Sequence, residues 1–455
     1  MAPAQVSITF DESVGLGLGY LRVINSVGTD VGAGPVVHPR GAGEVISVPL
    51  KRDLGVGTYI ASWRVISADS HPVEGTIRFV LGNGVLSRSA VTVPPVVDIS
   101  TSVAFDIART VSYASLAVLG GGWLLLSIWP AGRRNRNARR VLILGWVAGL
   151  VGAAGEMLLQ GPYAAGAGLA AVGRFGLFGD TIGTHYGQLH LIRLGLLAAI
   201  GVGLYALFVA SPRRPRLRRD TPLVLLFLGV VFTFSAAGHA GVAQPGWLAL
   251  GSDMAHLIAM SVWIGGLVLM AAAVLPGRDL ADLQGVLPVF SRVAFECVLL
   301  IAATGTYQAC RESGTIKALT TTTYGLLLVL KVVLFLGLVA LGNLSRVAIQ
   351  RRYLRSNKTA GSDMSATPES GTPDGSIAVR SGIAAGVDVG RMRRSVLAEL
   401  ALAGMVLAVT GVLVAQPPGR IAVAAAPVAS ASATSVLAPG PRRCRRSSSV
   451  RCRSR

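Results

Sequence analysis

Residues 235–266 read SAAGHAGVAQPGWLALGSDMAHLIAMSVWIGG. The segment contains the end of one apolar run, a short polar break and the start of the next, which predicts a hairpin of two membrane helices. His239 lies on the first arm and His256 on the second, each close to the break. Because the arms are antiparallel and the break is short, both imidazoles are expected at nearly the same depth, where they could share one ion. Ionisable residues at membrane depth are costly, which makes both histidines functional candidates.

Met260 adds a third candidate to this hairpin. It follows His256 by four residues and so lies on the same helix face. Imidazole together with thioether is a soft ligand set that suits copper better than magnesium or calcium. The alternative interpretation is that both histidines merely lie at the water interface, and the residues alone leave both interpretations open.

The composition is that of a membrane protein. Of the 455 residues, 52% are hydrophobic and 14% are charged, and the mean hydropathy is +0.59. A soluble protein of this size would be less apolar. The net charge of +20 would suggest nucleic acid in a soluble protein. Here the arginines gather between apolar runs as topology signals, so no nucleic-acid partner is expected. The four cysteines show no CxxC spacing and support neither a zinc site nor a disulfide framework.

Residues 1–95 differ from the rest of the chain. They contain short, β-branched, partly alternating segments punctuated by Gly, Pro and Asp, which predict a small antiparallel β-sandwich. The expected strands are 5–10, 20–25, 45–50, 58–66 and 75–81. A Pro-containing linker is expected at 96–106, before the membrane domain at 107–420.

Eight apolar runs follow, and each is long enough to cross a hydrocarbon core of about 30 Å at about 1.5 Å per residue. The sequence therefore predicts an all-α bundle of about eight transmembrane helices. The expected helices are 107–129, 141–160, 188–210, 222–241, 252–275, 289–309, 322–345 and 395–416.

The distribution of arginines predicts the topology of these helices in a bacterial cell membrane. Arginines are concentrated in alternate loops, and the positive-inside rule then places those loops in the cytoplasm. The β domain and both termini are expected outside. Residues 356–390 and 421–455, rich in small and polar residues, are expected to be disordered. The loops expected in the cytoplasm are 130–140, 211–221, 276–288 and 346–394.

In this topology the four membrane-domain histidines all fall at the outer helix ends. Beside the hairpin pair they are His185 and His190, and His185 is equally well a solvated loop residue. His190 and Met254 join the candidate copper ligands. The same outer half also holds Glu156 and Met157, the latter interpreted as packing. Three further charges in the apolar runs are interpreted as buried structural ion pairs in preference to an ion path: Glu296, Lys331 and Glu399.

The β domain has one candidate site of its own. Asp69 and His71 are two residues apart and project from the same face of an extended strand. One carboxylate and one imidazole make half a site for a divalent ion such as copper(II).

These motifs resemble a known family. The segment SADSHPVEGTIRFVLG at 67–82 resembles the signature of CopC, a periplasmic copper-binding β-sandwich of the Ig/cupredoxin-like type. The membrane part resembles CopD, its inner-membrane companion, and the order of segments resembles a CopC–CopD fusion over about residues 4–420. The CopD-like segments are SAAGHA at 235–240, MAHLIAMSVWIGGL at 254–267, FSRVAFECVLLIAATGTYQA at 290–309, TYGLLLVLKVVL at 323–334 and RRSVLAELALAGMVLAVTGVLVAQPPGR at 393–420.

The resemblance implies copper(II) binding by Asp69, His71 and a third ligand, the mature N-terminal histidine. The third ligand has no counterpart, because no histidine precedes His38, which we interpret as a surface residue. The family's first strand and a signal sequence are missing too. Two interpretations stay open: the true start lies upstream of Met1, or this member has lost the third ligand.

The sequence therefore predicts copper binding and transport across the cytoplasmic membrane, in copper uptake or copper resistance. The β domain would capture copper(II), and the helices would pass it inward, as copper(I) at depth. A periplasmic copper chaperone is a candidate partner, and lipid surrounds the bundle. No ATP-binding loop is present, and an enzyme is not expected. Two alternatives are a copper chaperone or assembly factor for a cuproenzyme, and a b-type haem protein with His239 and His256 or His190 as axial ligands.

Overall fold

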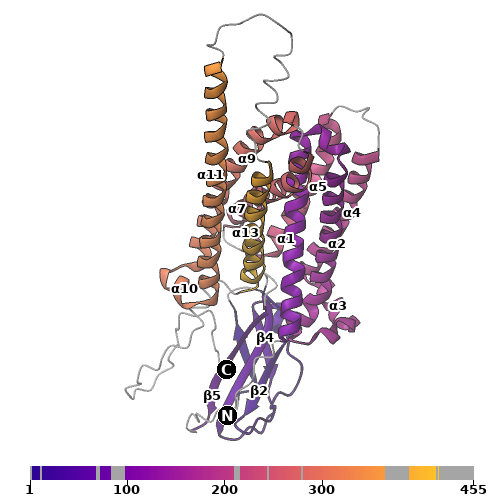
Figure 1. Cartoon of the computed structure of the whole chain (residues 1–455). Coiled ribbons are helices and arrows are strands. Elements are labelled where there is room, and N and C mark those ends of the chain that lie inside the picture. The colour runs from indigo at the N-terminus through magenta and orange to yellow at the C-terminus, as the bar shows by residue number, and fades with distance from the viewer. Residues whose placement is uncertain are drawn as a thin grey trace, which may run out of the picture.

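The computed structural model of the chain describes residues 3–10, 13–67, 72–83, 98–209, 216–242, 245–277, 280–363, 389–416 and 419. A β domain lies against one end of a bundle of long helices (Figure 1). The predicted fold class, an antiparallel β domain followed by a membrane-type helical bundle, is confirmed.

The β domain has five described strands in two antiparallel sheets, one of β1 and β3 and one in the order β2-β4-β5. Their apolar residues alternate toward a shared core, whose fully buried members include Val23, Ile46 and Val65. Trp63 on β4 lies directly over Gly75 on β5, where a side chain would overlap the indole ring. The strands are β1 (Gln5–Thr9), β2 (Val14–Asn25), β3 (Val45–Pro49), β4 (Gly57–Ser67) and β5 (Pro72–Leu81). All five predicted strands are confirmed.

The helices are α1 (Ile99–Ile128), α2 (Arg136–Ala165), α3 (Phe175–Gly183), α4 (His185–Val209), α5 (Arg216–Ala237), α6 (His239–Val242), α7 (Gly246–Leu269), α8 (Leu275–Gly277), α9 (Leu280–Ser313), α10 (Ile316–Thr321), α11 (Thr323–Asp363) and α13 (Val389–Val414). A π-helical turn, Met270–Val274, joins α7 to α8. In the described part of the chain, seven helices are long and apolar enough to cross a membrane. The predicted run 222–241 is divided, because α5 ends at Ala237 and α6 follows Gly238.

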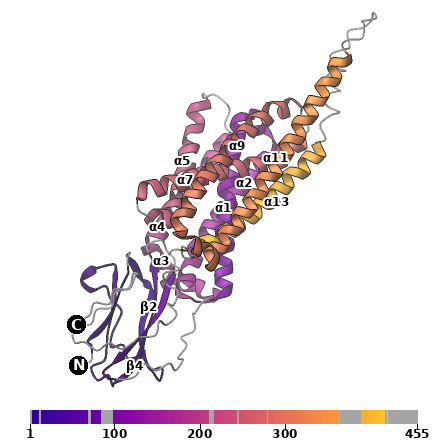
Figure 2. The ribbon, with the colours of Figure 1, turned by 90° about the vertical axis from the view of Figure 1, so that its left-hand side faces the viewer.

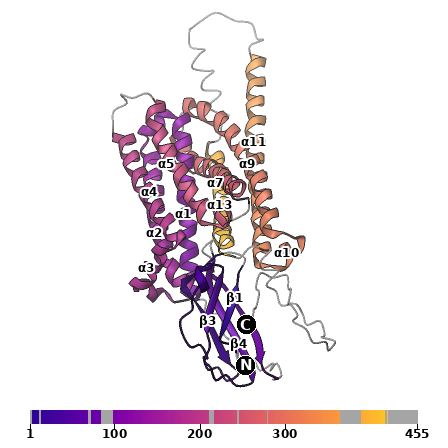
Figure 3. The ribbon, with the colours of Figure 1, turned by 180° about the vertical axis from the view of Figure 1, so that it is seen from behind.

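The central helix of the bundle is α1, which packs against α2, α7 and α13 (Figures 1 and 3). Its contact with α7 is a backbone-to-backbone approach, because a side chain at Gly121 would overlap the backbone of Gly265 and Gly266. Such small-residue contacts are the usual way in which membrane helices approach closely. The approach fixes α7, which carries His256, against the centre of the bundle.

Several predicted boundaries differ from the structure. The expected linker 96–106 is mostly helical, because α1 begins at Ile99, where Asp98 caps its first turn by accepting a hydrogen bond from the Thr101 amide at 2.8 Å. The first part of the segment expected to be disordered, 356–390, is helical, because α11 continues to Asp363. The rest of that loop up to 388, and the tail 421–455, lie outside the described residues.

The β domain is docked on the helices through β2, which contacts α2 and α3, and through Arg64 on β4 (Figure 2). Arg64, only 2% exposed, donates hydrogen bonds to the carbonyl oxygens of Ala164 at 2.7 Å and Tyr163 at 3.0 Å, at the end of α2. It also forms an ion pair with Glu74 on β5 at 3.1 Å. Ile66 packs beside these bonds in a small apolar cluster with Ala164. A buried arginine thus joins the sheet to the last carbonyl groups of a helix.

Candidate metal site and buried polar network

His256 is held between α7 and α9. Its Nδ1 lies 2.9 Å from the hydroxyl of Thr304 on α9, and its ring lies over Gly305, where a methyl group would be 3.4 Å from Cε1. The Thr304 hydroxyl has one proton, which it donates to the Leu300 carbonyl at 2.6 Å. Nδ1 of His256 must therefore be the donor to Thr304, which leaves the lone pair on Nε2. Nε2 has no hydrogen-bond partner in the described part of the chain.

A neutral imidazole with one nitrogen hydrogen-bonded and the other free is the form that binds metal ions. Met260 lies one turn further along the same face of α7 and is 9% exposed, so its thioether is available only from inside the bundle. Asp253 lies on this face too, one turn in the other direction. Lys331 on α11 interacts electrostatically with both His256 and Asp253.

The structure describes the other residues of the predicted hairpin in less detail. The backbone of His239 begins α6 directly after the break at Gly238, and its side chain lies outside the described residues. α5, α6 and α7 contact one another, so the hairpin itself is confirmed. A side chain at Gly241 would overlap the Ala236 carbonyl, which explains why this turn needs glycine. Met254, two residues before His256, packs against the hydrophobic core on another face of α7.

His190 has a different environment from the one predicted for a copper ligand. It is completely buried, and its Nδ1 lies 2.9 Å from the Tyr186 carbonyl oxygen, so Nδ1 carries the proton. Its Nε2 lies 3.0 Å from Nη1 of Arg193, which can only donate. Both ring nitrogens are therefore occupied, and metal binding would require Arg193 to move away. This geometry argues against His190 as a ligand.

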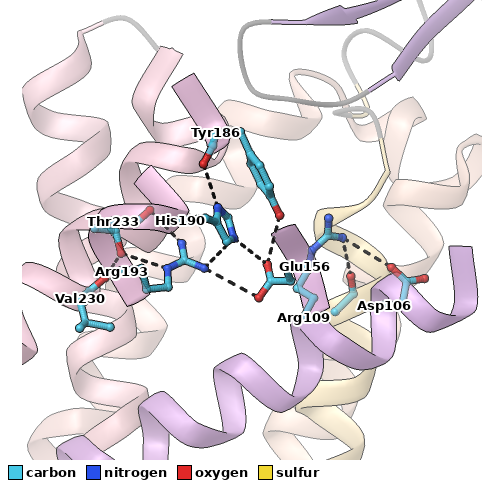
Figure 4. Close-up of polar contacts among 9 residues, drawn as sticks. Asp106, Arg109, Glu156, Tyr186, His190, Arg193, Val230 and Thr233 are labelled. Atoms are coloured by element: carbon cyan, nitrogen blue, oxygen red, sulfur yellow. Dashed lines mark hydrogen bonds and ion pairs between the residues drawn. The ribbon is translucent and has the colours of Figure 1, made fainter. Parts of the chain in front are cut away.

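Arg193 and His190 belong to a buried polar network of α2, α4 and α5, and a second polar group on α1 and α13 lies beside it (Figure 4). Glu156 on α2 accepts a hydrogen bond from the Tyr186 hydroxyl at 3.3 Å, and its other oxygen lies 3.8 Å from Arg193. Arg193 also donates to the Thr233 hydroxyl on α5 at 3.1 Å. Across a cavity of about 40 Å³, Arg109 on α1 donates to the Gly411 carbonyl on α13 at 3.2 Å. Two arginines thus accompany two acids, since Asp106 lies 3.5 Å from Arg109.

Comparison with known proteins shows the same division of the chain into a sheet and a bundle. Residues 1–82 match the family described as the CopC domain. Residues 100–250 match the family described as the copper resistance protein D-like N-terminal domain, and residues 284–413 match copper resistance protein D, CopD. The chain is a CopC–CopD fusion.

Two proteins illustrate the relationship. The copper transport protein CutJ of Bacillus subtilis (strain 168) is 28% identical over 357 residues, which cover 75% of this chain and 64% of that protein. The match thus spans less than two thirds of the length of that relative. The crystal structure of CopC from Methylosinus trichosporium OB3b is 25% identical, with a TM-score of 0.16, and the match covers 17% of this chain and 76% of that one.

Within the CopC domain, the predicted ligands Asp69 and His71 lie outside the described residues. His38 donates its Nδ1 proton to the Val45 carbonyl at 2.8 Å, in keeping with a surface role. In the described part of the chain, no three His, Cys, Asp or Glu side chains are grouped as a metal site. The candidate centre in the helical bundle therefore rests on His256 and Met260, which lie between the two matched segments 100–250 and 284–413.

Several residues of these two sites were not predicted from the sequence. Arg109 and Arg193 lie inside apolar runs, and an arginine there is itself a signal of a buried partner. Thr304 gave no comparable signal, because threonine is common in membrane helices. Of the three charges expected to be buried, Glu399 is buried and Lys331 is half-buried, whereas Glu296 is exposed on α9. The prediction that Glu296 is a buried ion-pair residue is wrong for the single chain.

Proposed function

We propose that this CopC–CopD fusion carries copper across the cell membrane by a path that includes His256 and Met260. The observation that supports it most directly is the free Nε2 of His256, whose ring is oriented by Thr304 and lies one turn from a thioether. Imidazole and thioether together favour copper over hard cations, and the thioether favours copper(I). The family relationship and the name of the CutJ relative agree with copper as cargo.

The proposed order in which copper meets its ligands follows from the positions of those ligands along the path. Copper binds first in the outer CopC domain, at Asp69 and His71. The docking of this domain on the end of α2 keeps it at the outer helix ends. Copper then reaches His239 and His256 and afterwards Met260, which is buried one turn deeper on α7 at a rise of about 6 Å. The ligands thus become softer as the ion leaves water.

Haem ligation through His190 loses support from the polar network around this residue. Both nitrogens of this histidine are occupied, and the cavity beside it, of about 40 Å³, has room for a water molecule and not for a macrocycle. Measuring whether copper reaches the inside of a vesicle distinguishes transport from the chaperone alternative.

The test uses the purified full chain in proteoliposomes with a copper indicator inside. The wild type should deliver copper to the lumen. His256→Ala should abolish delivery, and Met260→Leu should weaken it while keeping the fold, since Leu and Met are similar in volume. His185→Ala is the matched control, because His185 is exposed at the start of α4 and should matter least.

Delivery at the wild-type rate by the His239→Ala, His256→Ala double variant, at equal protein content, would remove the proposed path. Copper binding by the wild type without delivery to the lumen would support the chaperone function in its place.

A further inference from the structure

The outward face of α9 carries two charges within an otherwise apolar stripe. α9 packs mainly on α7, and smaller contacts join it to α1 and α11 (Figure 2). Its opposite side is exposed along the helix, with Phe295 at 52% and Leu299 at 55%. Arg292 and Glu296, four residues apart on this same face, are exposed as well.

Glu296 lies at membrane depth wherever α9 is placed along its axis. The helix has 34 residues and is about 51 Å long, whereas the hydrocarbon core is about 30 Å thick. Glu296 lies about 24 Å from the first residue and about 26 Å from the last. A core of that thickness spanned by this helix must therefore include Glu296. Arg292 lies about 6 Å nearer the end at Leu280.

Neither charge has a partner among the described residues. In the described ranges, Arg292 and Glu296 form no ion pair or hydrogen bond, with each other or with a third residue. The exposed face of α11 provides a contrast, because it presents Val329, Val333 and Leu336 at comparable exposure and no charge. That face suits lipid, whereas a lipid-facing carboxylate is unfavourable.

We propose that this face of α9 is the contact between two copies of the chain. A two-fold axis along the membrane normal places two α9 helices side by side, and an isologous contact brings the same face of both copies together. Arg292 of one copy then meets Glu296 of the partner subunit, twice. A stripe that carries both signs is complementary to itself, which is why a second copy fits it better than an unrelated helix does.

Disulfide crosslinking in native membranes tests the contact with the charges intact. In the full chain with its cysteines replaced, Leu299→Cys should give a crosslinked dimer on mild oxidation. Leu336→Cys on α11, which is similarly exposed at 59%, is the matched control and should stay monomeric. Absence of the Leu299→Cys dimer, or equal crosslinking at both positions, would overturn the proposal.

Charge reversal distinguishes a contact between copies from a pair within one helix. Arg292→Glu and Glu296→Arg should each lose self-association, because each places like charges opposite one another. Co-expression of the two variants with different tags should restore association. The first variant is acidic at both positions and the second is basic at both, so opposite charges meet in both pairs of the mixed dimer. A pair within one helix cannot be restored in this way. Failure of the mixed dimer to co-purify, with both chains in the membrane, would contradict the proposal whether or not copper is carried.

Discussion

At the scale of single residues, two histidines of the CopD region show how hydrogen bonding decides chemical availability. His190 has both ring nitrogens occupied by a carbonyl oxygen and a guanidinium group. His256 has one nitrogen fixed by Thr304 and the other free. The sequence predicts both residues at the outer helix ends, but only His190 lies in the first turns of its helix, because α7 begins at Gly246, ten residues before His256. Their partners, and not their depth, separate a structural histidine from a candidate ligand.

Thr304 should tune copper affinity without binding copper. Thr304→Val removes the acceptor for the Nδ1 proton at nearly constant volume, so the ring can adopt the other tautomer and orientation. We expect copper(I) affinity at His256 to fall by about 10–100-fold, the range typical of partners of metal-ligating histidines. Competition with a chelator measures it, and ¹⁵N shifts of the apo protein report the tautomer.

Thr304→Ser is the control for this prediction, because it keeps the hydroxyl and should keep the affinity. Unchanged affinity and unchanged tautomer in Thr304→Val would show that Thr304 does not position the ring. Copper binding by His256 is tested separately, by loss of binding in His256→Ala. The role of Thr304 in positioning the ring can therefore fail while copper binding by His256 holds.

At the scale of elements, helix ends and helix crossings set the position of the site. α7 is held against α1 at Gly265, where a methyl group would overlap the Ala117 carbonyl. The cap at Asp98 fixes the start of α1, which is also the helix next to the docked CopC domain. Each of these two features depends on a single residue, so one substitution can test each of them.

Gly265→Ala should separate α1 from α7 and destabilise the bundle by about 1–3 kcal/mol or more, because the overlap is with backbone and cannot be relieved by a rotamer change. Gly404→Ala on α13 is the matched control, since nothing lies within 4 Å of that position. Unfolding in mild detergent, followed by circular dichroism, measures the difference. Equal stability of the two variants would mean that the close approach of α1 and α7 is not required.

The first turn of α1 should depend on pH through Asp98. Hydrogen bonds from the Ser100 hydroxyl and the Thr101 amide hold the pKa of this carboxyl below its usual range. A lowered pKa stabilises the fold above the unfolded pKa, and that contribution is lost as pH falls through the folded pKa. Hydrogen exchange at the start of α1 should therefore rise in acid. Asp98→Asn keeps a capping oxygen and should show no such rise; the same rise in this variant would assign it to another group.

At the scale of the whole molecule, a buried arginine contributes to the contact between the two domains, beside contacts of β2 with α2 and α3. Arg64 of the CopC domain donates to the last carbonyl groups of α2, and Tyr163, which supplies one of them, stacks on Phe105 of α1 at 4.7 Å. Phe105 in turn lies under the Arg109 guanidinium at 4.5 Å. The domain contact thus leads directly to the polar network of the bundle.

Arg64→Ala should release the CopC domain from the bundle, because each hydrogen bond from a charged donor contributes about 1.5–3 kcal/mol. Spin labels at Val27 and Phe175, both highly exposed, should give a narrow distance distribution in the wild type and a broad one in the variant. Arg22→Ala, an exposed arginine on β2, serves as the control and should stay narrow. A narrow distribution in Arg64→Ala would show that other contacts are sufficient for docking.

The sequence by itself determined the order of the domains, the five strands and most of the long helices, because alternation and apolar length are local properties of the chain. It also placed His256 and Met260 on one face, since helical spacing is local too. Only the tertiary structure decided that His190 is occupied by Arg193, that Thr304 orients His256 and that Glu296 faces outward. Those facts depend on which helices are neighbours and how they are rotated, and residues far apart in sequence meet only when the chain has packed.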